Sequence, residues 1–240
     1  MIAHAEAASF AGGLKVASLA HGGGTSQADA QAAWSDSFVV NGPGYGLGSR
    51  GTFNAAVSVQ GGLRAEIAGL TYADAYVVAN FSLDTGIDNG HLSAQGGGRR
   101  SSGYDSGTSS SGQENFLLYF ENVPFVFGED IITSLALRTV AGNIGANQGG
   151  AAFASADYGH TMTWAGLSNV RDSSGRLLTD YSALSADSRF DFANLAPTLS
   201  VPEPASGALF VSGLLIFAYR MRRNPNLVRR AGSLSNSYSG

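Results

Sequence analysis

Short segments rich in β-branched and aromatic residues recur along most of the chain, and clusters of Gly, Ser, Asn and Asp separate them. This pattern is typical of β-strands joined by turns. The strand candidates are residues 14–20, 36–40, 51–59, 63–70, 75–83, 115–121, 124–127, 131–140, 151–156, 160–170 and 177–184. We therefore expect an all-β body over residues 10–191, folded as an antiparallel sandwich or jelly roll.

Glycine and serine mark the connections within this body. Asp172-Ser173-Ser174-Gly175 is a turn signal between two strand candidates, so residues 160–184 are expected to form a hairpin with Trp164 in the core. Residues 26–33 could form one short helical turn. Residues 86–112 consist mainly of Gly, Ser and charged residues, which predicts a long flexible loop. We expect residues 192–200 to be a linker.

Composition excludes several classes of protein. With 44% hydrophobic and 13% charged residues, the chain is not disordered by charge, and the absence of cysteine excludes disulfides and thiolate sites. All 18 acidic residues but only nine of the 14 basic residues precede Ala205. An acidic body is poorly suited to phosphate backbones, so we expect no binding to nucleic acid.

The basic residues that remain follow an apolar segment near the C-terminus. Residues 205–219 carry no charge, and Arg220, Arg222 and Arg223 come directly after them. As a helix the segment would span about 22 Å, which by length alone also suits a buried core helix. The arginines can reach the headgroups and extend this length, so we predict a single transmembrane helix. The positive-inside rule then places the body outside the cytoplasm.

A proline motif stands immediately before this segment. Pro202, Glu203 and Pro204 force an extended backbone, so the helix is expected to begin at about Ala205. In order, the motif, the apolar run and the arginine cluster resemble the PEP-CTERM sorting signal of Gram-negative bacteria that make extracellular polysaccharide.

The resemblance covers residues 201–223 and carries several implications. Pro202, Glu203 and Pro204 would be the recognition motif for an exosortase, a membrane-embedded processing enzyme, and the arginines would be the stop signal. The protein would be exported and held at the inner membrane with its body in the periplasm, or released to the cell surface or matrix. Residues 224–240 extend beyond the usual family end and are expected to be a disordered polar tail.

An exported protein needs a signal peptide, and the N-terminus shows only a trace of one. Ala3-His4-Ala5 matches the small-X-small pattern that precedes a cleavage site, but no apolar region lies before it. We therefore interpret residues 1–9 as the end of a signal peptide and the start of a mature chain at Glu6.

The search for catalytic residues is mostly negative. His21-Gly22-Gly23-Gly24 has no accompanying Gly-X-Ser-X-Gly elbow and is interpreted as a glycine turn. The four histidines are scattered, and Asp84, Asp88 and Asn89 lack the spacing of an EF-hand, so solvated loop residues are expected rather than a calcium site. The sequence predicts no enzyme, cofactor or metal.

Three functions remain open. The first is a structural or interaction protein of the cell envelope. The second is a carbohydrate-binding sandwich that acts on extracellular polysaccharide, with sugar-stacking candidates in glycine-rich loops: Tyr45, Tyr104 and Tyr158. The third, a secreted glycoside hydrolase, would need a carboxylate pair such as Glu129-Asp130 or Asp187 with Asp191.

Overall fold

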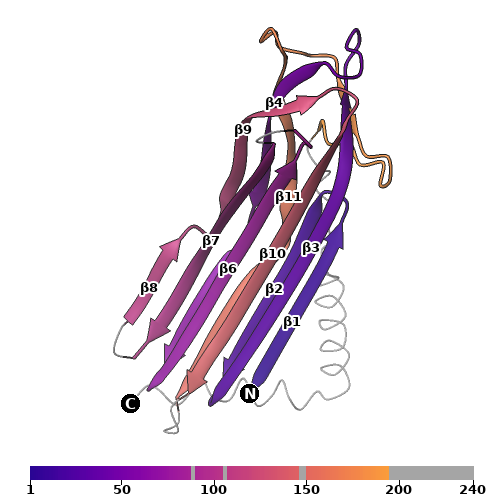
Figure 1. The fold of residues 1–240 in the computed structure, drawn as a ribbon. Helices are drawn as coiled ribbons and strands as arrows, with labels where there is room; N and C mark the ends of the chain where they lie inside the picture. Colours follow the sequence, from indigo (N-terminus) through magenta and orange to yellow (C-terminus); the bar gives the residue numbers. More distant parts are fainter. Residues whose placement is uncertain (88–89, 105–106, 146–149, 195–240) are drawn as a thin grey trace, which may run out of the picture. The chain divides into compact units, whose positions relative to one another are not determined.

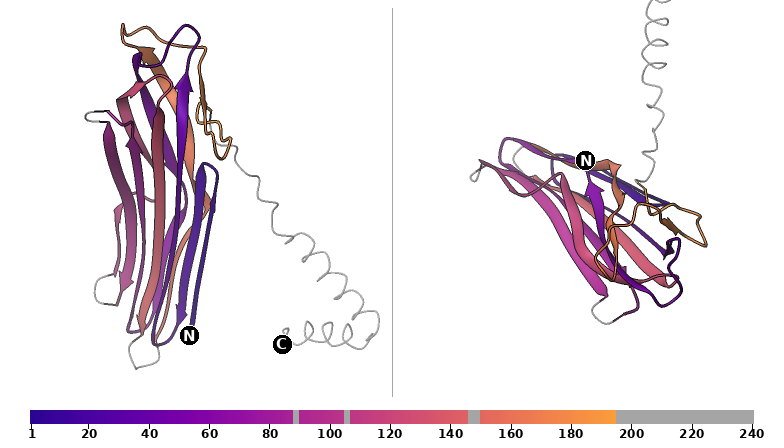
Figure 2. Two further views of the ribbon diagram at one scale, coloured as in Figure 1. Left: turned by 45° about the vertical axis from the view of Figure 1, so that its right-hand side comes forward. Right: turned by 90° about the horizontal axis from the view of Figure 1, so that it is seen from above.

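The chain folds into an all-β body of two antiparallel sheets packed face to face as a sandwich (Figure 1). The structure is a computed structural model, and it describes residues 1–194 except 88–89, 105–106 and 146–149. The two layers are separate when the body is viewed from above (Figure 2). The expected sandwich is therefore confirmed.

We call the two layers sheet I and sheet II. Sheet I has the order β1-β2-β11-β4-β9, with β5 beside β11, and sheet II has the order β12-β3-β10-β6-β7-β8. The strands of sheet I are β1 (Ile2–Phe10), β2 (Gly13–Gly22), β4 (Arg50–Val59), β5 (Gly62–Ala68), β9 (Phe116–Val126) and β11 (Ala151–Asp172). The strands of sheet II are β3 (Thr25–Asn41), β6 (Thr71–Asp84), β7 (His91–Gly103), β8 (Gly107–Gly112), β10 (Asp130–Gly145) and β12 (Ser182–Leu184).

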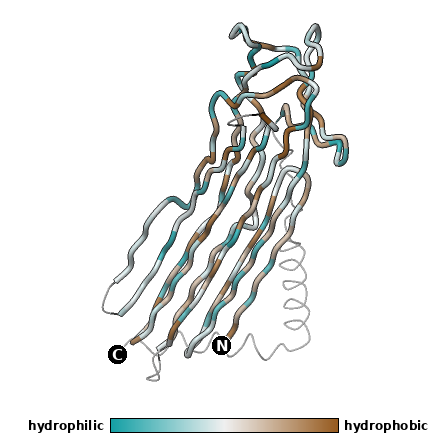
Figure 3. The backbone as a smooth tube through the Cα atoms, in the orientation of Figure 1, coloured by the Kyte–Doolittle hydropathy of each residue, from teal (hydrophilic) through white to brown (hydrophobic). Residues whose placement is uncertain are grey.

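Period-two alternation explains which face of each strand is buried. Along β3, Ser26, Ala28, Ala30 and Ala32 are buried while the residues between them are exposed. Successive side chains of a strand point to opposite faces, so this pattern fixes one inner and one outer face. Polar and apolar residues alternate along the other long strands as well (Figure 3). The helical turn expected at residues 26–33 is wrong, because alternation there suits a strand.

Side chains in the core grade from small to large along the sandwich. At one end Ala28, Ala75 and Ala141 share a row on the inner face of sheet II. Six residues further along each strand, the inner face of sheet II carries the larger side chains of Trp34, Leu135 and Phe81. Sheet I follows the same gradient, from Ala152, Ala154 and Ala156 to Trp164 on β11. Close packing therefore requires the sheets to approach more closely at the alanine end.

An aromatic cluster fills the wider end of the core. The Trp164 side chain is buried, as predicted, and its Nε1 donates to the carbonyl oxygen of Phe192 at 2.9 Å. Phe192 is buried too, and its ring stacks on Phe38 with centroids 4.3 Å apart. The linker expected from residue 192 is therefore wrong at its start, because Phe192 completes the core of the body.

Residues 86–112 are not the flexible loop that their composition predicted. They form β7 and β8, which extend sheet II at its edge. Glycine here serves close packing: a Cβ at Gly97 would lie 2.3 Å from the carbonyl oxygen of Val77, and one at Gly98 2.6 Å from that of Gln113. The glycines therefore let backbones approach each other rather than confer mobility.

The N-terminal residues also belong to the sheet. Residues 2–10 form β1, which pairs with β2 along its full length through a two-residue turn. Cleavage after Ala5, which stays a prediction, would divide this strand. The turn at Asp172–Gly175 is confirmed, with Gly175 N donating to Asp172 O at 2.9 Å. After it, only an isolated bridge joins Arg171 and Leu177 in place of the long second strand expected for a hairpin.

In the described part of the chain, no helix is long and apolar enough to cross a membrane. The sorting motif, the apolar segment 205–219, Arg220, Arg222, Arg223 and the tail 224–240 all lie outside the described residues.

A buried asparagine links the two sheets at their alanine end. Asn143 of β10 accepts a hydrogen bond from Ser26 N at 2.9 Å through its Oδ1. Its Nδ2 donates to Gly22 O at 3.1 Å and to Ala152 O at 3.2 Å, so one side chain bonds to both layers. Buried polar groups stabilise a fold only when they are paired in this way.

We expect Asn143→Leu to lower the free energy of unfolding by about 3 kcal/mol, because it removes the hydrogen bonds from this side chain to the backbone groups of Ser26, Gly22 and Ala152. Urea unfolding monitored by circular dichroism measures this difference.

Thr139→Val on the same strand is the matched control. The Thr139 hydroxyl is buried and has no hydrogen-bond partner among the described residues. The substitution should leave stability unchanged or raise it by about 1 kcal/mol. An equal loss in both variants would contradict the role given to Asn143.

Candidate functional site

The outer face of sheet II carries an ordered array of polar and aromatic side chains. The strands β3, β10, β6 and β7 lie side by side there (Figure 1). Their register places Asp29, Val140, Tyr76 and Arg99 in one row across the face. These residues belong to the outward alternation, so their side chains point to the outer face, where that of Val140 is buried and the other three are accessible.

A shallow depression of about 640 Å³ is set into this face between β6 and β7. Gly97 lies opposite Val78 and contributes no side chain, so the surface is hollowed there. Around it lie a phenol ring, a carboxylate, a guanidinium and an amide. The lining residues are Asp74, Tyr76, Val77, Val78, Gln95, Gly96, Gly97, Gly98, Arg99, Ser111 and Gly112.

Ion pairs hold the charged groups of the depression in place. Arg99 donates from Nε to Asp74 Oδ1 at 2.8 Å and from Nη2 to Oδ2 at 2.9 Å, a bidentate arrangement. The hydrogen bonds to Asp74 raise the pKa of Arg99. Arg99 Nη2 also donates to the hydroxyl of Tyr72 at 3.3 Å. Bidentate pairs fix geometry, so these groups present their remaining bonding positions in a fixed orientation.

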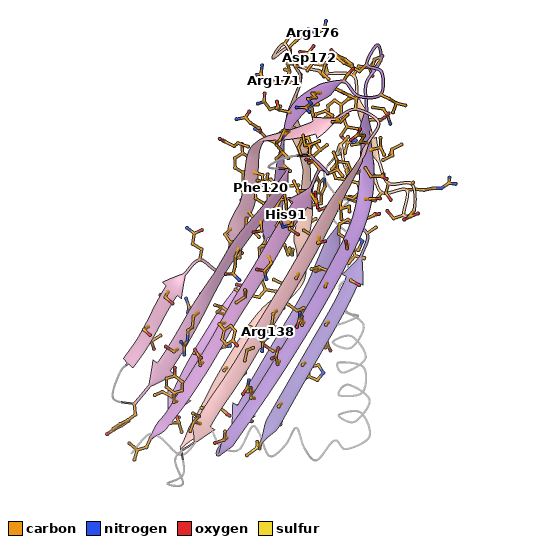
Figure 4. The ribbon with its side chains drawn as sticks, in the orientation of Figure 1. His91, Phe120, Arg138, Arg171, Asp172 and Arg176 are labelled. Atoms are coloured by element: carbon orange, nitrogen blue, oxygen red, sulfur yellow. The ribbon has the colours of Figure 1, made fainter. Side chains whose placement is uncertain are left out.

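A second pair lies on the same face, one row from Tyr76. Arg138, labelled in Figure 4, donates from Nε to Asp29 Oδ1 at 3.0 Å, and its Nη2 bonds to Oδ2. The hydrogen bond from Arg138 lowers the pKa of Asp29. Each arginine therefore has its own carboxylate, and the area around Tyr76 is close to neutral.

A second depression, of about 350 Å³, lies further along the outer face. Small residues of β3, β10 and β6 line it, among them Ala33, Ser82 and Ala136. Asn80 also lines it and accepts a hydrogen bond from Gln95, a residue of the first depression, at 3.0 Å. The two depressions therefore occupy neighbouring parts of one face.

The three tyrosines predicted to stack on sugars do not come together. Tyr158 is fully buried on β11 and donates to the carbonyl oxygen of Glu114 at 2.9 Å, and burial raises its pKa. The exposed position expected for Tyr158 is therefore wrong, since the strand alternation turns it into the core. Tyr104, which is 63% exposed, follows β7 at the edge of sheet II.

Tyr45 belongs to a hydrogen-bonded cluster at one end of the body. Its ring stacks on Phe127 with centroids 4.6 Å apart, and its hydroxyl donates to Asp172 Oδ2 at 2.8 Å. Arg176 donates to the same hydroxyl, and Asp172 and Arg176 lie together in Figure 4. Hydrogen bonds from the hydroxyls of Ser174 and Tyr45 hold the pKa of Asp172 well below its usual range. We call Tyr45, Phe127, Asp172, Ser174 and Arg176 the Tyr45–Asp172 cluster. It joins the loop between β3 and β4 to the turn that follows β11.

The other candidates do not assemble into a site. Asp191 caps the local backbone by accepting from Ala193 N at 2.9 Å. His21 and Gly22 end β2, and Gly23 and Gly24 connect it to β3; Gly22 and Gly24 have positive φ. Asp88 and Asn89 lie outside the described residues, and among the described ones no three His, Asp or Glu side chains are grouped to hold a metal ion.

Sequence reasoning missed the outer face of sheet II. The signal was present in residues 72–80, where Tyr72, Asp74, Tyr76 and Asn80 occupy alternate positions, but the strand candidate began only at residue 75. Gln95 and Arg99 could not be joined to it, because residues 86–112 were interpreted as a loop.

No protein-family model matches the chain, and neither a curated protein nor a solved structure is found to be similar to it. The resemblance to the PEP-CTERM sorting signal stays a prediction.

We expect Tyr45→Phe to raise the pKa of Asp172, because the variant removes one of the hydroxyl donors that favour the charged carboxylate. A group with a depressed pKa stabilises the fold at neutral pH, and this contribution is lost as the pH falls through its folded-state pKa. The variant should therefore be less stable at neutral pH, and the difference should vanish in strong acid. A carbon-detected NMR titration of Asp172 measures the pKa, with Tyr104→Phe as the control. An unchanged pKa in Tyr45→Phe would show that this hydroxyl does not bond to Asp172 in solution.

Proposed function

We propose that this protein is an exported cell-envelope protein whose β-body binds polysaccharide on the outer face of sheet II. The observation that carries the proposal is the depression beside Tyr76, in which an aromatic ring lies among fixed polar groups. Binding sites commonly combine an apolar surface with a few placed polar groups that set orientation.

The chemistry of the depression favours sugars over other ligands. The ring of Tyr76 offers an apolar surface for the C–H face of a sugar, while Gln95, Asp74 and Arg99 offer partners for its hydroxyls. Within each of the two Asp–Arg pairs the charges cancel, so no unpaired charge in the site selects an ionic ligand. The second depression on the same face suits a chain of sugar units rather than a single one.

The same geometry favours binding over cleavage. Glycoside hydrolysis by the usual mechanisms employs two carboxyl groups on either side of the bond that breaks. Asp74 is the single carboxylate among the residues that line the first depression, and both of its oxygens accept from Arg99.

The C-terminal sequence supports the location. Pro202-Glu203-Pro204, the uncharged run 205–219 and the arginine cluster suit recognition by an exosortase and retention at the inner membrane. A body held on the outer side of that membrane, or released from it, would meet the extracellular polysaccharide that its outer face is proposed to bind.

We expect Tyr76→Ala to weaken polysaccharide binding about tenfold, because it removes the ring on which a sugar would stack. Affinity electrophoresis in gels that contain the exopolysaccharide of the source organism measures this loss. Tyr104→Ala is the matched control: it removes a tyrosine of the same sheet that lies outside the depression and should bind as the wild type does. Equal binding by all three proteins would refute the site, and no retardation of the wild type would refute the function.

We expect Leu214→Arg to reduce membrane retention strongly, because a central charge costs about 2.5–3.5 kcal/mol on the insertion scale. Leu214→Ile, which keeps the segment apolar, is the control. Replacing Arg220, Arg222 and Arg223 with glutamine should disturb the orientation of the segment in the membrane but not its insertion. Fractionation of the proteins, each fused to a working signal peptide, measures retention. A wild-type fusion found wholly in the soluble fraction would contradict the anchor.

A further inference from the structure

The strand β1 is exposed on both of its faces and forms the edge of sheet I. Ile2 to Ser9 are all exposed, although β1 is paired to β2 along its full length. Among the described residues no strand pairs with its outer edge. An edge strand presents a row of backbone donors and acceptors that another strand can pair with.

The two-residue turn between β1 and β2 shows which residues of β1 face this edge. In a hairpin with such a turn the two residues that flank it form a hydrogen-bonded pair, and here these are Phe10 and Gly13. In an antiparallel ladder successive residues direct their backbone N–H and C=O groups to opposite sides. Gly13 and Lys15 therefore point toward β1.

Their partners on β1 point back toward β2. Gly13 pairs with Phe10, and Lys15 pairs with Ala8. By the same alternation, the N–H and C=O groups of Ala3, Ala5 and Ala7 point to the outer edge. These three residues have small side chains, which leave room for a second strand.

The polar side chains of β1 are complementary to those of a second copy, because a His N–H can donate to a Glu carboxylate. His4 and Glu6 lie on one face of the strand, with Nε2 and Oε1 3.5 Å apart. If two copies of β1 pair antiparallel about a two-fold axis at Ala5, His4 of each copy lies opposite Glu6 of the other. An axis at His4 or at Glu6 would instead place like groups opposite each other, which is unfavourable.

We propose that the protein forms a homodimer through antiparallel pairing of β1 with β1 of a second copy, about a two-fold axis at Ala5. Ala5 then bonds to Ala5 of the second copy through both backbone groups, and Ala3 bonds likewise to Ala7. Sheet I becomes continuous across the dimer. An axis at Ala5 therefore meets two independent conditions. It places His4 opposite Glu6, and it pairs the outward-facing backbone groups of Ala3, Ala5 and Ala7.

The other fully exposed edge strand lacks this specificity. β8, at the edge of sheet II, has the sequence Gly-Thr-Ser-Ser-Ser-Gly and carries no charge that could select a register. The proposed dimer requires residues 2–5, so it applies to a chain that is not cleaved after Ala5.

Single cysteines test the register, because the natural chain contains no cysteine. In Ala5→Cys the two introduced residues face each other across the axis with Cα atoms about 5.5 Å apart, within the roughly 4.4–6.8 Å that a disulfide spans. Mild oxidation of the full chain in detergent should yield a covalent dimer. Intact mass spectrometry confirms that the chain retains its first five residues.

Ala3→Cys is the matched control. Its cysteines lie about 13 Å apart along the two strands in the proposed register and should not join. A mixture of Ala3→Cys and Ala7→Cys should give a mixed covalent dimer. Cross-linking of Ala3→Cys alone as fast as Ala5→Cys, or no cross-linking of Ala5→Cys, would overturn the proposal.

A charge exchange provides a second measurement. His4→Glu places like charges opposite each other and should weaken dimerisation about tenfold in analytical ultracentrifugation. His4→Glu combined with Glu6→His restores a His opposite a Glu and should recover the dimer. A wild-type protein that is monomeric at every concentration, or a double variant as weak as the single one, would contradict the proposal.

Discussion

Burial of two sheet faces against each other, with side chains graded from alanine to aromatic, is the constraint on which the rest of the structure depends. The alanine rows let the sheets approach at one end, and Trp164, Phe38 and Phe192 fill the wider end. At the alanine end the buried side chain of Asn143 forms hydrogen bonds to both sheets and links them. Near the edge of sheet II, the glycines of β7 likewise allow backbone segments to pack closely.

The same packing determines where function can be located. Because the inner faces of both sheets form the core, Tyr76, Asp74 and Arg99 lie on the outer face, at the outward positions of β6 and β7. Paired charges hold these groups in fixed positions without help from a loop. A rigid sheet is a suitable support for a binding face, because its side chains need little reordering when a ligand arrives.

Sequence patterns predicted the sandwich because strand periodicity is local and strong. The strand at residues 51–59 and the turn at Asp172–Gly175 depend on neighbours in the chain, and both are confirmed. The patterns failed where tertiary packing determines the structure. In sequence Gly97 is typical of a loop, but in the fold it allows a close approach to the carbonyl of Val77. Phe192 is likewise typical of a linker in sequence, but its ring stacks on Phe38 in the core. The candidate face depends on pairing between residues 71–84 and 91–103, which no local pattern contains.

The most direct measurement of the central claim is an NMR titration of the protein with oligosaccharides cut from the polysaccharide of its source organism. We predict that shift changes concentrate on the ring of Tyr76 and on the side-chain N–H groups of Gln95 and Arg99, and leave Tyr45 and Tyr104 unchanged. Shift changes confined to the Tyr45–Asp172 cluster or to Tyr104, or none at saturating sugar, would contradict the account.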